Sequence, residues 1–161
     1  MGWSMLNFSG EEIIEIALKM EESGKLFYEK ALPLAKGDKL KEMLIYLAEE
    51  EGKHYQAFLK LGKELKYQIS PNESYDGEYE GYVKSLVNSH IFKLIEVEDL
   101  VKEIKNDLDI LRFAISFEKD SIVIFQEFKN ASNKAGAEIL EKLINEEKGH
   151  IKKISELFQS M

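Results

Sequence analysis

The fold of this chain is decided by the stretch LAEEEGKH at residues 47–54 and by its echo LINEEKGH at residues 143–150. Each stretch ends in Glu-x-x-His, formed by Glu51 with His54 and by Glu147 with His150. Residues three apart lie on one face of a helix, so each motif points a carboxylate and an imidazole the same way. The chain has three histidines, and two of them fall in these motifs.

Both motifs lie on an apolar stripe with helical spacing. The first stripe is Leu40, Leu44, Leu47, Glu51, His54, Phe58 and Leu61, and the second is Leu140, Leu143, Glu147, His150, Ile154 and Leu157. A water-exposed helix turns such a stripe towards the core. Buried charge costs several kcal/mol per ion unless it is paired or bound to metal. The pattern therefore predicts that these groups are compensated, and a pair of metal ions does so directly.

The composition narrows the function classes. The 161 residues suffice for one domain, and 44% hydrophobic with 32% charged residues suits a globular protein. A net charge of -8 argues against nucleic acids and anionic membranes as partners. The absence of cysteine excludes disulfides, thiolate catalysis and iron–sulfur sites. We find no signal peptide pattern and no run of about 18 apolar residues, so we expect a cytoplasmic protein without membrane contacts.

Only two prolines and ten glycines interrupt the chain, which favours long helices. We predict an all-α single domain over residues 1–161, with helices at about 10–36, 39–62, 107–130 and 133–159. Residues 63–106 form a long connector, with helical periodicity at 78–95 and 97–105 and turns near Pro71 and Gly77. We expect His90 to be a surface or connector residue outside any motif.

Helix ends are marked by familiar capping residues. Ser9 and Glu12 form a capping box at the first helix, and Asp38 is expected to cap the second. Pro33 should bend or loosen the last turn of the first helix. Ser132 or Asn133 is expected to cap the last helix.

The two halves of the chain repeat. The segment 17–21 matches 114–118 at an offset of 97 residues, and the Glu-x-x-His motifs match at an offset of 96. The chain is therefore a duplicated helical hairpin, and the long connector lets the two hairpins close into one four-helix bundle.

Each predicted bundle helix contributes one inward acid, and two of the helices add a histidine. The set is Glu21, Glu51, His54, Glu118, Glu147 and His150. Four carboxylates balance the charge of two divalent ions, and one imidazole per ion completes a nitrogen and oxygen set suited to iron or manganese. Six protein groups leave coordination positions for dioxygen, peroxide or water. Glu22 is expected to be solvated, whereas Glu21 shares the apolar face.

Tyr28 follows Glu21 by seven residues and lies on the same face two turns on. The sequence leaves two roles open for this residue. Tyr28 is either a hydrogen-bond donor or radical outlet beside the metal ligands, or a core tyrosine whose hydroxyl is hydrogen-bonded to another group. Phe125 fills the equivalent place in the second half, so a hydroxyl is not required in both.

The chain resembles the rubrerythrin and ferritin-like superfamily. The resemblance is carried by the segments 17–28, 47–54, 114–125 and 146–150, which cover all four predicted bundle helices. It implies a ferritin-like bundle that forms a homodimer and binds two iron ions, with manganese or a mixed pair as alternatives. Family members typically reduce peroxide or oxidise ferrous iron with dioxygen.

The sequence departs from the family pattern in two ways, which limit the family properties that we expect for this chain. Rubrerythrins with peroxidase activity usually carry a cysteine-rich rubredoxin domain, so electrons would here come from an external donor such as rubredoxin. Ser121 stands where rubrerythrins carry a further glutamate, which makes the six-ligand set more like that of bacterioferritin. Three functions stay open: a peroxide- or dioxygen-reducing oxidoreductase, an iron-handling ferroxidase or sequestration protein, and a bundle that metal only stabilises.

Overall fold

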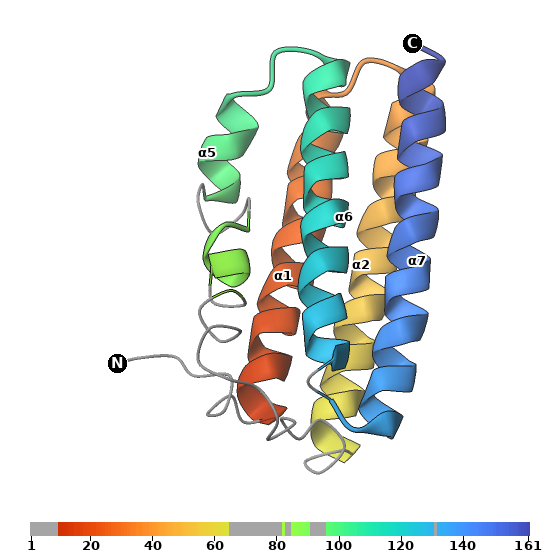
Figure 1. The fold of residues 1–161 in the computed structure, drawn as a ribbon. Coiled ribbons are helices and arrows are strands. Elements are labelled where there is room, and N and C mark those ends of the chain that lie inside the picture. Colours follow the sequence, from red (N-terminus) through yellow and green to blue (C-terminus); the bar gives the residue numbers. More distant parts are fainter. Residues whose placement is uncertain (1–9, 65–81, 83–84, 91–95, 131) are drawn as a thin grey trace.

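The computed structural model describes residues 10–64, 82, 85–90, 96–130 and 132–161, with side chains described from Ile14 to Lys63 in the first range. Four long helices form a bundle: α1 (Gly10–Ala31), α2 (Asp38–Glu64), α6 (Asp107–Asn130) and α7 (Lys134–Gln159) (Figure 1). A short 3₁₀-helix, η1 (Leu32–Leu34), follows α1, and α5 (Val97–Lys102) precedes α6. The described residues contain no strand, and the predicted all-α ferritin-like bundle is confirmed.

The bundle is built from two antiparallel hairpins. α1 packs mainly against α2, and α6 packs mainly against α7. α5 lies outside the four-helix core and packs against α1 (Figure 1). Because the chain passes from one end of the bundle to the other between α2 and α6, these two helices run in the same direction (Figure 1). One such long crossover is the connection found in ferritin-like bundles.

The turn between α1 and α2 differs from expectation in one detail. Asp38 is the first residue of α2 and not its N-cap, because the carbonyl of Gly37 already accepts the first helical bond, from the Lys41 N–H at 3.0 Å. The turn is held from α6 instead. The Asp107 carboxylate accepts the N–H groups of Lys36 and Gly37 at 2.9 and 2.8 Å. This contact ties the first hairpin to the second.

The predicted end of the first helix, at about residue 36, is wrong: α1 ends at Ala31, and η1 ends at Leu34. The described ends of the other three long helices agree with the prediction within one or two residues. Pro33 lies in η1, so the last turn of the first helix is loosened as expected. Asn133 caps α7, where its side chain accepts the Gly136 N–H at 3.0 Å. The Ser9 capping box and the connector segments 65–81 and 91–95 lie outside the described residues.

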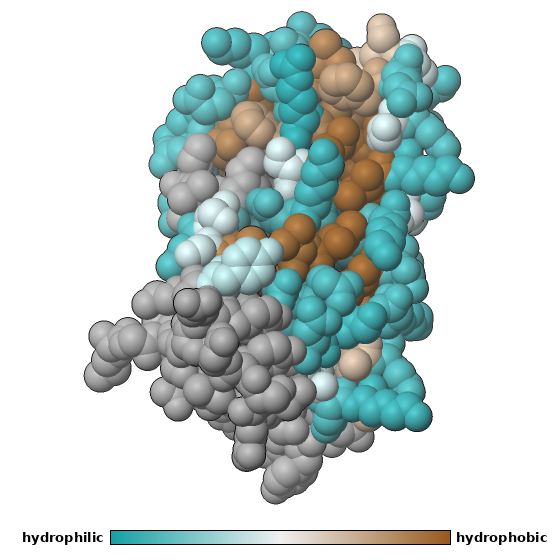
Figure 2. Space-filling model, viewed as in Figure 1, coloured by the Kyte–Doolittle hydropathy of each residue, from teal (hydrophilic) through white to brown (hydrophobic). Residues whose placement is uncertain are grey.

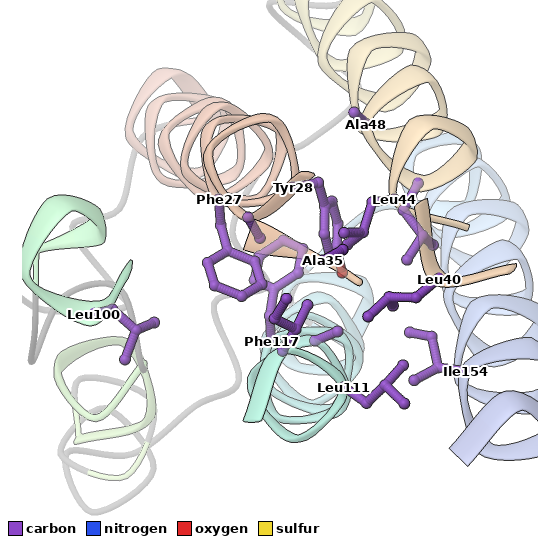
Figure 3. Packing of buried hydrophobic residues seen from close by; sticks show 14 of the residues in the cluster. Phe27, Tyr28, Ala35, Leu40, Leu44, Ala48, Leu100, Leu111, Phe117 and Ile154 are labelled. Carbon is purple, nitrogen blue, oxygen red and sulfur yellow. The ribbon is translucent and has the colours of Figure 1, made fainter. Parts of the chain in front are cut away.

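Two clusters of buried apolar side chains fill the bundle on either side of its middle. One cluster includes Phe58 and Phe125, and the other includes Phe27, Tyr28 and Phe117. Figure 3 shows the second cluster, in which side chains from α1, α2, α6 and α7 point into one space. The inward acids of the sequence lie between the two clusters along each helix.

Gly24 allows α1 to approach α6 closely. A Cβ atom at this position would lie 2.3 Å from Cζ of Phe117, which is closer than any side chain tolerates. Phe117 is fully buried, and its ring also meets the ring of His90 edge-on at 5.8 Å. His90 is only 4% exposed, so of the two places that the sequence left open it occupies the connector and not the surface.

The outer surface mixes hydrophilic and hydrophobic side chains. Over the face that carries α6 and α7, Figure 2 shows hydrophobic surface emerging between hydrophilic groups. Among the helices described, none is long and apolar enough to cross a membrane.

Candidate metal centre

The six residues predicted to bind metal converge in the middle of the bundle. Each of them is at most 2% exposed: Glu21, Glu51, His54, Glu118, Glu147 and His150. They form two sets of potential metal ligands, and within each set one ligand atom per residue lies within 4.8 Å of the others. One set is Glu21, Glu51, His54 and Glu147, and the other is Glu51, Glu118, Glu147 and His150. Glu51 and Glu147 belong to both sets and lie between the two positions.

The helical register explains this convergence. In each helix the functional group occupies the position at which the apolar stripe crosses the middle of the bundle. On α1, Ala17 and Tyr28 flank Glu21 on the buried face, whereas the adjacent Glu22 is exposed as expected. On α2, Glu49 is exposed and Glu50 is half-buried. The hairpin repeat then places the same arrangement on α6 and α7.

Several buried oxygens of this cluster have no hydrogen-bond partner. These unpaired oxygens are the two carboxylate oxygens of Glu21, the two of Glu51, and Oε2 of Glu118. Buried polar atoms are normally paired, because leaving one unpaired costs free energy. A divalent cation satisfies several carboxylate oxygens at once. The donor set of carboxylates and imidazoles therefore fits metal ions of the iron and manganese type.

The two histidines turn the same ring nitrogen towards the carboxylates. Nδ1 of His54 lies 3.0 Å from Glu147 Oε1 and 3.6 Å from Glu21 Oε2. Nδ1 of His150 lies 2.9 Å from Glu147 Oε2 and 3.4 Å from Glu118 Oε2. The rings are nearly parallel, at 17°, with centroids 5.5 Å apart. Glu147 thus joins the two halves of the centre, and Nδ1 is the atom that each ring offers to a metal.

The carboxylates perturb one another strongly. Burial, followed by the charges of Glu21 and Glu147, raises the pKa of Glu51 well above its ordinary value. Burial and Glu147 likewise raise the pKa of Glu118. Burial opposes ionisation of Glu147 as well, but the nearby carboxyl group of Glu118 and the hydrogen bonds from the two histidines outweigh burial and lower the pKa of Glu147.

Both imidazoles hold protons firmly when no metal is bound. Burial alone would lower the pKa of His54, but the hydrogen bond to Glu147 and the nearby carboxylate of Glu21 outweigh burial and raise the pKa to about 11. For His150, too, burial would lower the pKa, but the nearby carboxylate of Glu118 and the hydrogen bond to Glu147 outweigh burial and raise the pKa to about 10. Protons therefore compensate the buried carboxylates in the metal-free protein, and a bound cation has to displace them.

Tyr28 is both a core residue and a hydrogen-bond donor to one of the predicted metal ligands. Its ring is fully buried in the core, and its hydroxyl donates a hydrogen bond to Glu118 Oε1 at 2.5 Å. Burial and the nearby carboxylates raise the pKa of Tyr28, so the phenol stays a neutral donor. Its counterpart Phe125 has no hydroxyl and packs on Phe58 with ring centroids 5.2 Å apart.

Glu146 also belongs to the centre, although the sequence did not single it out. Its Oε2 atom lies 2.9 Å from Nε2 of His54, on the side of the ring that faces away from the carboxylate cluster. The one signal in the sequence is its position next to Glu147, which matches Glu50 next to Glu51 in the first half. Ser121 is fully buried, and its hydroxyl has no hydrogen-bond partner in the described part of the chain.

A surface groove between α2 and α7 leads to this edge of the centre. Its volume is about 740 Å³, and its lining includes Glu50, His54, Lys142 and Glu146. The groove thus reaches the edge of the centre at His54, where the Glu146 carboxylate covers Nε2 of the ring.

Comparison with known protein families identifies the family of this chain. The model described as Rubrerythrin matches residues 12–104, which is more than half of the chain. The chain belongs to the rubrerythrin family. The rubrerythrin match includes Glu21, Glu51 and His54, whereas the ligand set of α6 and α7 lies beyond its end. Those second-half residues are supported by the internal repeat and by their place in the bundle. No curated protein and no solved structure matches the chain.

Proposed function

We propose that this rubrerythrin-family chain binds two iron ions in the six-residue centre and reduces peroxide or dioxygen with electrons from an external donor. The observation that carries the proposal is the pair of ligand sets sharing Glu51 and Glu147. In this arrangement Glu21 and His54 would complete one position, and Glu118 and His150 the other. A manganese or mixed-metal pair suits the same donors.

Charge supports the assignment of two ions. Four ionised glutamates carry four negative charges, and two divalent cations cancel them with both imidazoles neutral. When bound, a pair of ferrous ions supplies two electrons, the number needed to convert one peroxide and two protons into two water molecules. The stoichiometry of the centre therefore matches that of the proposed reaction.

The surrounding residues prepare the centre for this role. Tyr28 occupies Oε1 of Glu118 and leaves Oε2, which has no other partner, for a metal ion. Glu147 is oriented by both histidines through its two oxygens. The apolar clusters on either side keep bulk water from the carboxylates. The groove that reaches His54 brings solvent closest to the centre at Glu146, so we propose this edge as the place where a substrate as small as peroxide approaches.

Electron supply is the part that this chain does not provide. The 161 residues contain no cysteine, so a separate one-electron carrier such as rubredoxin is proposed as the donor. A homodimer stays a prediction from the family resemblance, and a cytoplasmic location stays a prediction from the sequence.

Anaerobic loading followed by peroxide addition tests the function. We expect two ferrous ions per chain, oxidation of both by one equivalent of peroxide, and repeated turnover once reduced rubredoxin is supplied. Glu51→Gln should abolish the reaction, and Glu49→Gln, an exposed neighbour on the same helix, should not. Accumulation of many irons per chain in a cage would instead favour iron handling. Bound metal that is inert to peroxide would leave only a structural role.

A further inference from the structure

Glu146 closes the outer side of His54. Its side chain is 37% exposed on α7, whereas that of His54 is 2% exposed. Oε2 of Glu146 lies 2.9 Å from Nε2 of His54, and Oε1 lies 4.0 Å from Nζ of Lys142. One oxygen of this carboxylate is thus committed to the imidazole, and the other faces the surface.

This contact determines which nitrogen of His54 is available to a metal. A carboxylate accepts hydrogen bonds and cannot donate them when ionised, so Nε2 must carry the proton that Glu146 accepts. Nδ1 is then the nitrogen that gives up its proton, and it already faces Glu147 and Glu21. Carboxylates that accept the outer N–H of a ligating histidine fix its orientation and raise its basicity.

The second histidine lacks this support. By the 96-residue repeat, the counterpart of Glu146 is Glu50, which forms an ion pair with Lys53 at 2.5 Å. An oxygen of Glu50 lies within 4.8 Å of a ring nitrogen of each histidine. Among the residues that the structure describes, however, no carboxylate lies within 4.0 Å of Nε2 of His150.

An aromatic ring takes the place of a carboxylate beside His150. Tyr46 meets the imidazole edge-on, with centroids 5.8 Å apart, and Nζ of Lys153 lies 3.9 Å from the centroid of the Tyr46 ring. This contact packs the ring of His150 but adds no negative charge to it. The near-symmetric ligand sets therefore have unequal surroundings.

We propose that Glu146 is a positioning residue that makes the metal position of Glu21 and His54 the tighter of the two, so that it fills first. The inference rests on the proposed two-metal centre and adds an order of loading to it. The Glu146 carboxylate accepts the Nε2–H of His54 and so makes Nδ1 of this imidazole a stronger metal ligand.

Titration of the full-length metal-free protein with Co²⁺ tests the order, because visible absorption reports each bound ion without turnover. The wild type should bind two ions in two resolved steps. In Glu146→Ala the first step should weaken about 10-fold or more, the range found for lost outer partners of metal ligands, and the two steps should merge. Glu146→Gln keeps an acceptor for the His54 N–H, so it should restore part of the first step.

A matched variant separates positioning from general charge. Glu138 is exposed in the same groove, and Glu138→Ala removes one negative charge without touching His54. We expect Glu138→Ala to keep the two-step titration. Circular dichroism of the metal-free variants should show wild-type helicity, which excludes a folding defect as the cause.

The inference is overturned if Glu146→Ala titrates like the wild type, or if it weakens both steps equally. A wild-type protein that takes up no stoichiometric Co²⁺ would overturn the two-metal centre itself, and this inference with it. Intact wild-type binding with an unchanged Glu146→Ala titration would refute only the role of Glu146.

Discussion

Replacing Glu51 by glutamine should stabilise the metal-free protein while destroying its response to metal. Glu51 is fully buried, and neither of its oxygens has a hydrogen-bond partner. Its pKa is raised well above the ordinary value by burial and by the charges of Glu21 and Glu147. In the metal-free fold the side chain is therefore held as a neutral acid. Glutamine has nearly the same shape and is neutral at every pH.

The gain in the free energy of unfolding can be worked out from the cost of keeping Glu51 protonated in the folded chain. Below pH about 4.5 the acid is neutral in both the folded and the unfolded chain, so the variant gains nothing there. As the pH rises, the unfolded chain loses the proton more readily than the folded one, which costs about 1.4 kcal/mol of stability per pH unit. At pH 7 this cost reaches an upper bound of about 3.5 kcal/mol. A gain of about 1–3 kcal/mol corresponds to a rise in Tm of roughly 2–12 °C in a chain of this size.

Thermal unfolding by circular dichroism, with chelator or with anaerobic Fe²⁺, measures both effects. We expect Glu51→Gln to melt above the wild type in chelator, with a difference that shrinks towards pH 4.5. Fe²⁺ should raise the Tm of the wild type and leave that of the variant almost unchanged. Glu49→Gln, on the exposed face, serves as the control and should follow the wild type in both conditions. A metal-free Glu51→Gln protein that melts below the wild type at pH 7 would refute the reasoning, and so would an equal metal response.

Two further predictions concern protons and packing. Because His54 and His150 have pKa values raised to about 11 and 10, both must lose a proton when they ligate metal, so Mn²⁺ affinity should increase from pH 6 to pH 9. Calorimetry in buffers of different ionisation enthalpy should detect the released protons, and a pH-independent affinity would contradict this. Gly24→Ala should destabilise the protein by about 1–3 kcal/mol, since its Cβ would meet Phe117 at 2.3 Å. Gly149→Ala, with nothing within 4 Å, should instead gain about 0.5–1 kcal/mol, and equal denaturation midpoints for the two variants would disprove the close approach.

The sequence was sufficient for the bundle and for the convergence of the six inward groups. Helical periodicity shows which face of a helix is buried, and the repeat shows that two hairpins bury equivalent groups. A glutamate on such a face has to meet its counterparts in the middle of the bundle. These features depend on local spacing, which the sequence displays directly.

The sequence could not predict the contacts made by half-buried side chains at the edges of the helices, because these contacts depend on the tertiary arrangement. The reach of Glu146 to His54, and of Asp107 to the N–H groups of the α1–α2 turn, spans residues far apart in the chain. No periodic pattern shows which half-exposed carboxylate finds a partner on another helix. The burial of His90 against Phe117 likewise depends on where the connector lies.

The central claim is that one pair of metal ions lies between Glu51 and Glu147. Its most direct test is a crystal structure of protein loaded anaerobically with Fe²⁺, with anomalous difference maps recorded at the iron edge. We predict two peaks per chain, one contacting Nδ1 of His54 and the other Nδ1 of His150, with both glutamates bridging them. A single peak, or iron bound only at exposed carboxylates such as Glu138, would contradict the account.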